Sequence, residues 1–192
     1  MSTSFINTKI ETNRLTLRPL TPRDANILYK IMSDSEGKHC QKTDVKKPKK
    51  ETINFISNTT MNMDTSTKIT FGLIRKSDHA LIGICILFNL IKNSKTAEIG
   101  YSLTSGAWNF GKNYMSEALF GFLSFAFTRL NLNLIEAKID PRNTDSVRFL
   151  KRLGFHKENY LKQRWVIQDE LVDSEIYGLL KEEWQLIKKL NN

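Results

Sequence analysis

The spacing of apolar and polar positions predicts that the chain begins with a strand followed by a helix. Apolar and polar residues alternate over Arg14–Arg18, which is typical of a half-buried strand, and Pro19 ends this run. The next residues, Thr21–Asp24, have the features of a helix start: a Thr cap, Pro at the first helical position and an acidic residue in the first turn. Apolar residues then follow at helical spacing, at Ala25, Leu28, Ile31 and Met32. We expect a second short helix over Glu51–Ser57.

Three strand-like runs come next, and short turns separate them. They cover Lys68–Arg75, Leu81–Leu90 and Ala97–Leu103, with turn residues at Ser77–His79 and Lys92–Lys95. Leu81–Leu90 is almost entirely apolar and rich in Ile, as in a strand that is covered on both faces. Because two hairpin-like turns connect three consecutive strands, we expect an antiparallel meander.

The clearest helix signal lies after Gly111. Apolar residues keep the helical pattern over about four turns, at Met115, Ala118, Leu119, Phe122, Leu123, Ala126, Phe127 and Leu130. Asn131–Asn133 ends this helix, and Leu134–Ile139 returns as a strand. A strand, a helix and a strand of these lengths predict a βαβ crossover between parallel strands.

The last part of the chain predicts a short helix and a final pair of strands. Thr144–Leu153 is expected to be helical and to end at Gly154, in the position of a C-terminal cap. Strand-like runs over Tyr160–Ile167 and Ser174–Leu180 flank a turn at Gln168–Glu170. The chain has no repeats, no low-complexity segment and no linker, so we expect residues 1–192 to form one mixed α/β domain.

The composition is that of an ordinary globular protein, but its charge is not balanced. The 192 residues contain 29 Lys and Arg against 20 Asp and Glu, a formal net charge of +9, which predicts an anionic partner. The longest apolar run, Leu81–Leu90, has the length of a strand and is too short to span a membrane. The N-terminus lacks a secretory signal, and the 2 Cys and 3 His have no metal-binding spacing. We therefore expect a cytoplasmic protein with reduced thiols, without a metal and without membrane attachment.

The segment before the long helix is the first candidate for binding chemistry. Ala97–Ala118 contains Gly106, Gly111, several small polar residues and Lys112. The N-terminus of a helix exposes unpaired N–H groups and the positive end of the helix dipole, a combination that binds phosphate. The segment matches neither the Walker pattern nor the dinucleotide fingerprint, so it is either a phosphate-binding loop or a structural turn.

A set of residues spread over nearly the whole chain occurs in one order, with gaps typical of one family. The set comprises Ile82-Gly83, Ala97-Glu98-Ile99-Gly100-Tyr101, Trp108, Gly111-Lys112, Glu117-Ala118, Asn143, Ser146, Gly154-Phe155, Asp173, Tyr177 and Trp184. With these residues the chain resembles the GNAT superfamily of acetyl-CoA-dependent N-acetyltransferases. Within it, the chain resembles most the ribosomal-protein N-terminal acetyltransferases of the RimJ/RimL type. The resemblance covers about Ile10–Trp184.

The resemblance implies a GNAT-like fold and a place for coenzyme A. The fold is a central twisted mixed sheet with helices on both faces, in which the parallel fourth and fifth strands splay apart and coenzyme A lies between them. The cofactor-binding residues that it implies are Tyr101, Ser102 and Leu103 for the pantetheine arm; Asn109, Phe110, Gly111, Lys112, Asn113, Tyr114 and Met115 for the pyrophosphate; and Asn143, Ser146 and Lys151. Arg148 and Arg152 are further cations near the phosphates.

The phosphate loop departs from the family pattern at one position. The family commonly has Gly-x-Gly there, whereas this chain has Gly111-Lys112-Asn113. Asn tolerates positive φ better than most residues, so we expect the loop to close. The added side chain would crowd the pyrophosphate, and Lys112 would partly offset that loss.

Acetyl transfer to an amine needs a base for the amine, a stabilised carbonyl oxygen and a proton for the leaving thiolate. Strand alternation places Glu98 opposite Ala97 and Ile99, where it is either the base, directly or through a water, or a strand Glu paired with a nearby Lys. Many GNAT enzymes have a Tyr as general acid where this chain has Leu150. The branch instead has the Ser that matches Ser146, which either serves the sulfur through a water relay or is an ordinary helix residue.

The sequence does not name the acceptor. The leading hypothesis is a protein N-terminal amine, as in a ribosomal protein, with a small amine such as a polyamine as the alternative. We expect the acceptor pocket between the first helix, its following loop and the hairpin at Tyr160–Asp173. A non-catalytic acyl-CoA sensor or RNA-binding module on the same fold is the rival class. The Lys46–Lys50 cluster either contacts RNA or the ribosome or is a solvated loop, and a homodimer stays open.

Overall fold

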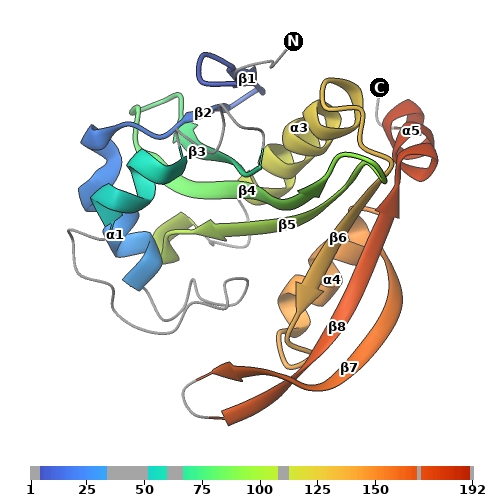
Figure 1. The fold of residues 1–192 in the computed structure, drawn as a ribbon. Coiled ribbons are helices and arrows are strands. Elements are labelled where there is room, and N and C mark those ends of the chain that lie inside the picture. The colour runs from blue at the N-terminus through green and yellow to red at the C-terminus, as the bar shows by residue number, and fades with distance from the viewer. Residues whose placement is uncertain (1–4, 34–51, 60–66, 108–112, 168–169, 191–192) are drawn as a thin grey trace.

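One mixed sheet organises the chain (Figure 1). The computed structural model describes residues 5–33, 52–59, 67–107, 113–167 and 170–190. Over these residues the sheet has the strand order β1-β2-β3-β4-β5-β6-β8-β7. The strands are β1 (Ile10–Glu11), β2 (Leu15–Pro19), β3 (Ile69–Arg75), β4 (Leu81–Ile91), β5 (Thr96–Leu103), β6 (Leu134–Ile139), β7 (His156–Ile167) and β8 (Glu170–Leu180). The helices are η1 (Pro22–Asp24), α1 (Ala25–Ser33), η3 (Ser105–Ala107), α3 (Tyr114–Thr128), α4 (Thr144–Arg152) and α5 (Lys181–Leu190), and residues 52–59 are also helical.

The connections follow the predicted topology. Strands β2 to β5 pair antiparallel with their neighbours, which confirms the meander. Strand β6 pairs parallel to β5 after the crossover through α3, as the βαβ prediction requires. Strand β8 then pairs antiparallel with β6, and β7 forms the edge of the sheet.

The two parallel strands separate part of the way along their length. Pairing of β5 with β6 ends at Glu98↔Glu136, although β5 continues to Leu103 and β6 to Ile139. Figure 1 shows the result: β5 runs on beside β4, whereas β6 and β8 turn away from it. The sheet therefore has a V-shaped opening between β5 and β6, as the GNAT resemblance implies.

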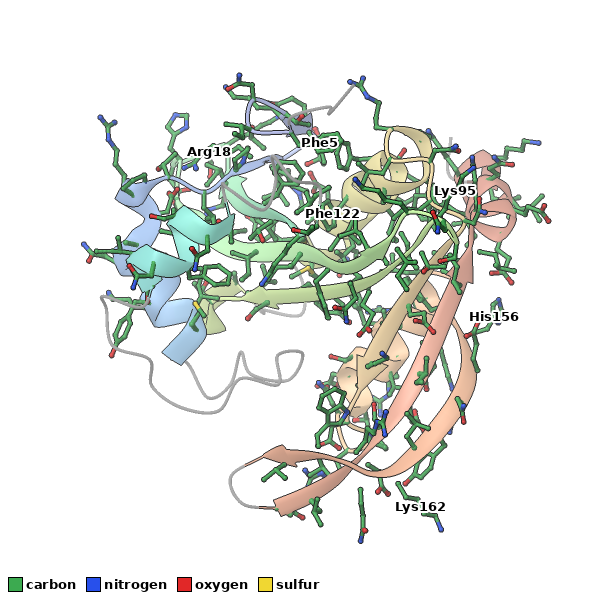
Figure 2. The ribbon with its side chains drawn as sticks, in the orientation of Figure 1. Phe5, Arg18, Lys95, Phe122, His156 and Lys162 are labelled. Carbon is green, nitrogen blue, oxygen red and sulfur yellow. The ribbon has the colours of Figure 1, made fainter. Side chains whose placement is uncertain are left out.

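Alternation along β5 assigns each of its residues to one face of the sheet. Ala97, Ile99, Tyr101 and Leu103 belong to the larger apolar core, which α3, α4 and α5 cover. Phe122 of α3 lies in this core, where Figure 2 labels it. A smaller core on the other face joins α1 and helical residues 52–59 to β4; its buried residues are Leu20, Ala25, Leu28, Ile31, Ile56, Ile74, Leu81, Ile84 and Ile86. Helices therefore cover both faces.

Several element boundaries differ from the sequence prediction. The Thr21–Asp24 start is present, but it forms the 3-10 turn η1 before α1 begins. The carboxylate of Asp24 accepts hydrogen bonds from Thr21 and from the guanidinium of Arg18, which fixes this turn. Strands β7 and β8 are longer than expected, and Glu170 begins β8. The helix α5 was not predicted.

Helix α5 is attached to the core by one aromatic side chain. Trp184 is 1 % exposed, and its ring lies 4.8 Å from that of Phe120 and 6.1 Å from that of Phe127 on α3. Within the part of the chain that the structure describes, none of the helices has the length and apolar character needed to cross a bilayer.

Candidate active site

A cleft of about 530 Å³ lies between the start of α3 and α4. The end of β5, the turn η3, the first turn of α3 and one face of α4 form its walls. Its lining residues are Leu103, Ala107, Asn113, Tyr114, Met115, Ser116, Asp145, Arg148, Phe149, Lys151 and Arg152. Leu103, Asn113, Tyr114, Met115 and Lys151 among them were predicted to bind the cofactor, so the fold brings these five residues together.

The first turn of α3 forms part of the wall of this cleft. Asn113, at the N-cap, has the left-handed conformation (φ 48°, ψ 26°) and makes no side-chain cap hydrogen bond. Asn113 thus has a positive φ, at the position where the family commonly has Gly. An uncapped helix start presents N–H groups and the positive end of the helix dipole, which suits a phosphate. The other predicted loop residues, Asn109, Phe110, Gly111 and Lys112, lie outside the described residues.

The opposite wall of the cleft is positively charged. Helix α4 buries Phe149 and Leu150 toward the core, and its other face carries Arg148, Lys151 and Arg152 at the cleft. Arg148 has an ionic partner, Asp145, but the atoms are 3.7 Å apart and both side chains are exposed, so the pair is weak. Net positive charge therefore faces the uncapped start of α3 across the cleft.

The opening between β5 and β6 adjoins this cleft at Leu103. Tyr101 is 1 % exposed and packs its ring edge-on against Phe149 of α4 at 5.4 Å, which ties β5 to α4. Ser102, one residue along, is buried on the other face. Of the three residues predicted to pair with the pantetheine arm, only Leu103 lines the cleft, and the backbone pairing itself stays a prediction.

Glu98 lies at the point where the strands separate and is held there by two donors. Lys138 Nζ donates to its Oε1 at 2.6 Å, and Asn89 Nδ2 donates to the same atom at 2.8 Å. The side chain is 12 % exposed. No described residue donates to Oε2, so one carboxylate oxygen keeps its capacity to accept a proton. Glu98 is therefore paired with a Lys, as one of the two alternatives expected. This pairing does not decide whether Glu98 is also the base.

The sequence did not indicate which residues would hold Glu98. Lys138 is on β6, opposite β5, and reaches Glu98 only because the two strands are parallel and in register at Glu98↔Glu136. Asn89 has positive φ (51°) at the bulge of β4, where the register with β5 shifts. A bulge re-aims one side chain, here toward a carboxylate, and bulges are frequent next to active sites.

Asn143 and Ser146 lie at the start of α4 and are buried. Asn143 Oδ1 accepts the backbone N–H of Ser146 at 3.1 Å, so Asn143 is the N-cap of α4. Neither residue lines the cleft, and their predicted roles toward the cofactor stay predictions. Leu150, where many GNAT enzymes have a Tyr, is fully buried in the core. Cys85 is buried as well, and burial raises the pKa of its thiol, so it is not a nucleophile.

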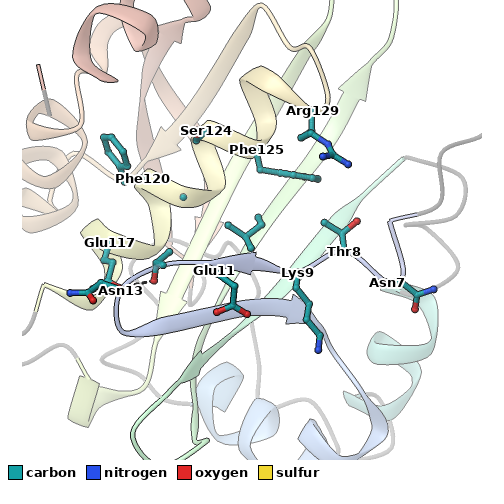
Figure 3. Close-up of a pocket in the computed structure, with 13 residues that line it drawn as sticks. Asn7, Thr8, Lys9, Glu11, Asn13, Glu117, Phe120, Ser124, Phe125 and Arg129 are labelled. Carbon is teal, nitrogen blue, oxygen red and sulfur yellow. Dashed lines mark hydrogen bonds between the residues drawn. The ribbon is translucent and has the colours of Figure 1, made fainter. Parts of the chain in front are cut away.

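A second cleft, of about 770 Å³, lies on the other side of α3 (Figure 3). It is formed by residues 7–13 and by the outer face of α3 down to Arg129. Although it is larger, its two cations, Lys9 and Arg129, are balanced by the carboxylates of Glu11 and Glu117, and it lacks the uncapped helix start. In the smaller cleft three cations outnumber the single carboxylate of Asp145. The smaller cleft is therefore the candidate site for a phosphate.

The long β7–β8 hairpin, beside which the acceptor pocket is expected, projects beyond the rest of the sheet in Figure 1. Asp173 holds the hairpin bulge by accepting hydrogen bonds from the Tyr160 hydroxyl and from the backbone N–H of Gln163. Arg142 ties the β6–α4 connection to the hairpin through Glu170 at 2.9 Å. The Lys46–Lys50 cluster lies outside the described residues. Within those residues, no group of His, Cys, Asp and Glu is arranged to hold a metal.

Comparison with known proteins gives one consistent family. A sequence model of the acetyltransferase (GNAT) domain matches residues 14–156. An uncharacterized N-acetyltransferase, p20 of Bacillus licheniformis, is 36 % identical over 178 residues, which cover 90 % of this chain and 96 % of p20. The [ribosomal protein uS5]-alanine N-acetyltransferase of Escherichia coli is 31 % identical over 115 residues, 59 % of this chain and 58 % of that protein.

Solved structures share the fold. The spermidine N-acetyltransferase of Vibrio cholerae, in complex with CoA and spermine, superposes with a TM-score of 0.80 at 19 % identity, over 90 % of this chain and 98 % of that one. At this identity the likeness concerns the fold alone.

Proposed function

This chain belongs to the acetyltransferase (GNAT) domain family, and we propose that it transfers the acetyl group of acetyl-CoA to a protein N-terminal amine. Members and relatives of the family are N-acetyltransferases that use acetyl-CoA, so the chain is an acyltransferase. The identity of the acceptor and the roles of individual residues are the proposal.

The observation that carries the assignment is the composition of the smaller cleft. Three cations of α4 face the uncapped start of α3, and the cleft ends at Leu103, where β5 has left β6. A compact polyanion with a long uncharged arm, such as coenzyme A, has both features that this arrangement accommodates. Its phosphates would lie between α3 and α4, and its arm would lie along β5 toward Glu98. Bound acetyl-CoA supplies an activated acyl group.

We propose that Glu98 accepts the proton of the attacking amine, directly or through a water. Its Oε1 is fixed by Lys138 and Asn89, so the carboxylate keeps one orientation, and Oε2 is the atom that would receive the proton. It faces away from the α3 core, toward the side of the sheet that carries α1. The amine would approach from that side and the cofactor from the other, so that the two would meet at the opening between β5 and β6.

Ser146 is the proposed hydroxyl for the leaving sulfur. It is 3 % exposed on the first turn of α4, and its position is set by the N-cap Asn143. The pKa of a serine hydroxyl is far above neutrality, so the proton itself would come through a water relay. The N–H groups near Leu103 would polarise the acetyl carbonyl.

Two classes of acceptor are supported to different degrees. The relative that acetylates a ribosomal-protein alanine is 31 % identical, whereas the spermidine acetyltransferase shares the fold at 19 % identity. A polyamine also carries several positive charges toward a chain of net charge +9, and the carboxylate at the opening is already paired with Lys138. We therefore favour a protein N-terminal amine.

The test is acetylation of an acceptor panel, read by mass spectrometry. The panel contains peptides with free N-terminal Ala or Ser, the same peptides with blocked N-termini and an internal Lys, and spermidine. Modification of the free N-termini alone supports the proposal, and modification of spermidine alone overturns the acceptor assignment. Binding of CoA in calorimetry without transfer to any member supports a sensor, and no binding at high micromolar CoA refutes both.

Glu98→Gln tests the proposed base. The variant keeps an oxygen that can accept from Lys138 but cannot take up the proton, so kcat should fall about 10²- to 10⁴-fold while the Kd for CoA stays within about twofold. Glu182→Gln, an equal change of charge on exposed α5, is the matched control and should leave both quantities unchanged. An unchanged kcat in Glu98→Gln would reject Glu98 as the base.

A further inference from the structure

The first turn of α3 is attached to the connection between β1 and β2 by a carboxylate. Glu117 Oε1 accepts from Thr12 Oγ1 and from the backbone N–H of Arg14, both at 2.6 Å, and its Oε2 accepts from Arg14 Nε at 2.7 Å. Burial alone would raise the pKa of Glu117, but these hydrogen bonds outweigh it and hold the pKa below its ordinary value. Both oxygens are therefore engaged, and the carboxylate is ionised at neutral pH.

The same turn is also held by contacts between two guanidinium groups and the ring of Tyr114. The guanidinium of Arg14 lies over the Tyr114 ring, 4.7 Å from its centroid, and that of Arg75 lies 5.9 Å from it. Arg75 is in turn held by Asp78 through two hydrogen bonds of 2.9 and 2.5 Å. A guanidinium over the face of an aromatic ring is attracted by the ring's quadrupole. We call Arg14, Arg75, Tyr114 and Glu117 the Tyr114 clamp.

The clamp acts on the turn that lines the phosphate cleft. Tyr114 belongs to both, since the lining includes Asn113, Tyr114, Met115 and Ser116. Among the described residues, the side chain of the N-cap does not fix this turn, because Asn113 has a left-handed backbone and makes no side-chain cap hydrogen bond. The direction of its N–H groups therefore depends on what holds the helix from the side, and the described residues that do so come from the connection between β1 and β2 and from the end of β3.

We propose that the Tyr114 clamp positions the start of α3 for the phosphates of the cofactor. This inference rests on the proposed function, because it needs a phosphate ligand in the cleft. Arg14 and Arg75 are positioning residues: they act through Glu117 and Tyr114, without contact to the ligand. A preformed set of N–H groups binds without the cost of ordering the turn, so loss of the clamp should weaken binding of any ligand that carries the phosphates.

The test is calorimetry of CoA and of adenosine 3′,5′-bisphosphate, which keeps two phosphates but lacks the arm. Arg14→Met and Tyr114→Ala should raise the Kd of both ligands by the same factor, about tenfold, which equals about 1.4 kcal/mol. Arg129→Met removes one positive charge at the other end of α3 and is the matched control, expected within about twofold.

Each outcome bears on one claim. If wild type binds no CoA, the proposed function is wrong, and this inference falls with it. If wild type binds CoA and both Arg14→Met and Tyr114→Ala bind it equally well, only the clamp is refuted. If Arg129→Met raises the Kd by the same factor as Arg14→Met, the net charge of the protein determines binding and the clamp does not. That result would also overturn the inference. Melting curves confirm that each variant is folded, and Arg75→Met replaces Arg14→Met if the latter does not fold.

Discussion

Gly83→Ala should separate β4 from β5 where the cofactor arm is expected. Gly83 of β4 pairs with Leu103 of β5, and a Cβ at position 83 would lie 2.4 Å from the carbonyl oxygen of Ser102 and 2.6 Å from Leu103 Cδ2. Contacts of Cβ under 3.0 Å are essentially never observed, so the carbonyl must move by about 0.6 Å. Because the obstacle is backbone, a change of rotamer cannot relieve it.

The expected cost is that of overpacking, about 1–3 kcal/mol in the free energy of unfolding. For a chain of this size, each kcal/mol lowers Tm by roughly 2–4 °C. The displaced residues, Ser102 and Leu103, border the opening of the sheet, so the Kd for CoA should rise as well. The assays are thermal unfolding followed by circular dichroism and calorimetry with CoA.

Gly106→Ala is the matched control for this change. A Cβ at Gly106 meets nothing within 4 Å, so its free energy of unfolding should stay within about 0.5 kcal/mol of the wild type. A Gly83→Ala variant with unchanged Tm would refute the close approach of β4 to β5. Equal losses in both variants would show that the loss of Gly, and not the contact, is responsible.

Two further predictions concern stability, beside those for Glu98 and the clamp. Trp184→Ala should lower the free energy of unfolding by about 3–5 kcal/mol, because it removes a buried aromatic side chain that attaches α5 to the core. The control is Leu190→Ala, at an 86 % exposed position, which should change the free energy of unfolding by less than about 0.5 kcal/mol. Asp24→Asn should lower the free energy of unfolding by about 1–3 kcal/mol at neutral pH. Burial opposes ionisation of Asp24, but hydrogen bonds from Arg18 and Thr21 outweigh it and keep the pKa of Asp24 below its usual 3.8. A carboxylate whose pKa is lower in the folded state stabilises the fold above its unfolded-state pKa. This stabilisation is lost as the pH falls through the folded-state pKa. In urea unfolding, the difference between wild type and Asp24→Asn should therefore shrink below pH 3.8; a difference that stays constant with pH would contradict this assignment.

The sequence predicted the elements that local patterns define. The apolar run of β4, the helical spacing of α3 and the alternation around Glu98 depend on neighbouring residues, so the meander, the crossover and the face of Glu98 were all predictable. The start of β7 was missed because His156–Asn159 are all polar, as an exposed hairpin permits. The start of β8 was missed because the turn was expected to include Glu170, which is instead the first residue of the strand. Helix α5 was missed because only Trp184 and Ile187 mark its buried side.

The sequence pattern placed a candidate phosphate site at the start of the long helix, and the GNAT resemblance named its residues. Asn113, Tyr114 and Lys151 were expected on that ground, and all three line the cleft. The contacts that orient the side chains are non-local. Glu98 and Lys138 meet across 40 positions, and Arg14 and Glu117 across 103. Only the register of the parallel strands and the packing of α3 on β2 bring these pairs together, and no local pattern encodes either.

A crystal structure with bound CoA tests the central claim most directly, because the fold offers two clefts beside α3. The account predicts phosphate density between the first turn of α3 and the cations Arg148, Lys151 and Arg152, with the arm entering the opening beside β5 and its sulfur near Glu98. Nucleotide density in the larger cleft under residues 7–13, or an arm that does not enter the opening between β5 and β6, would contradict it.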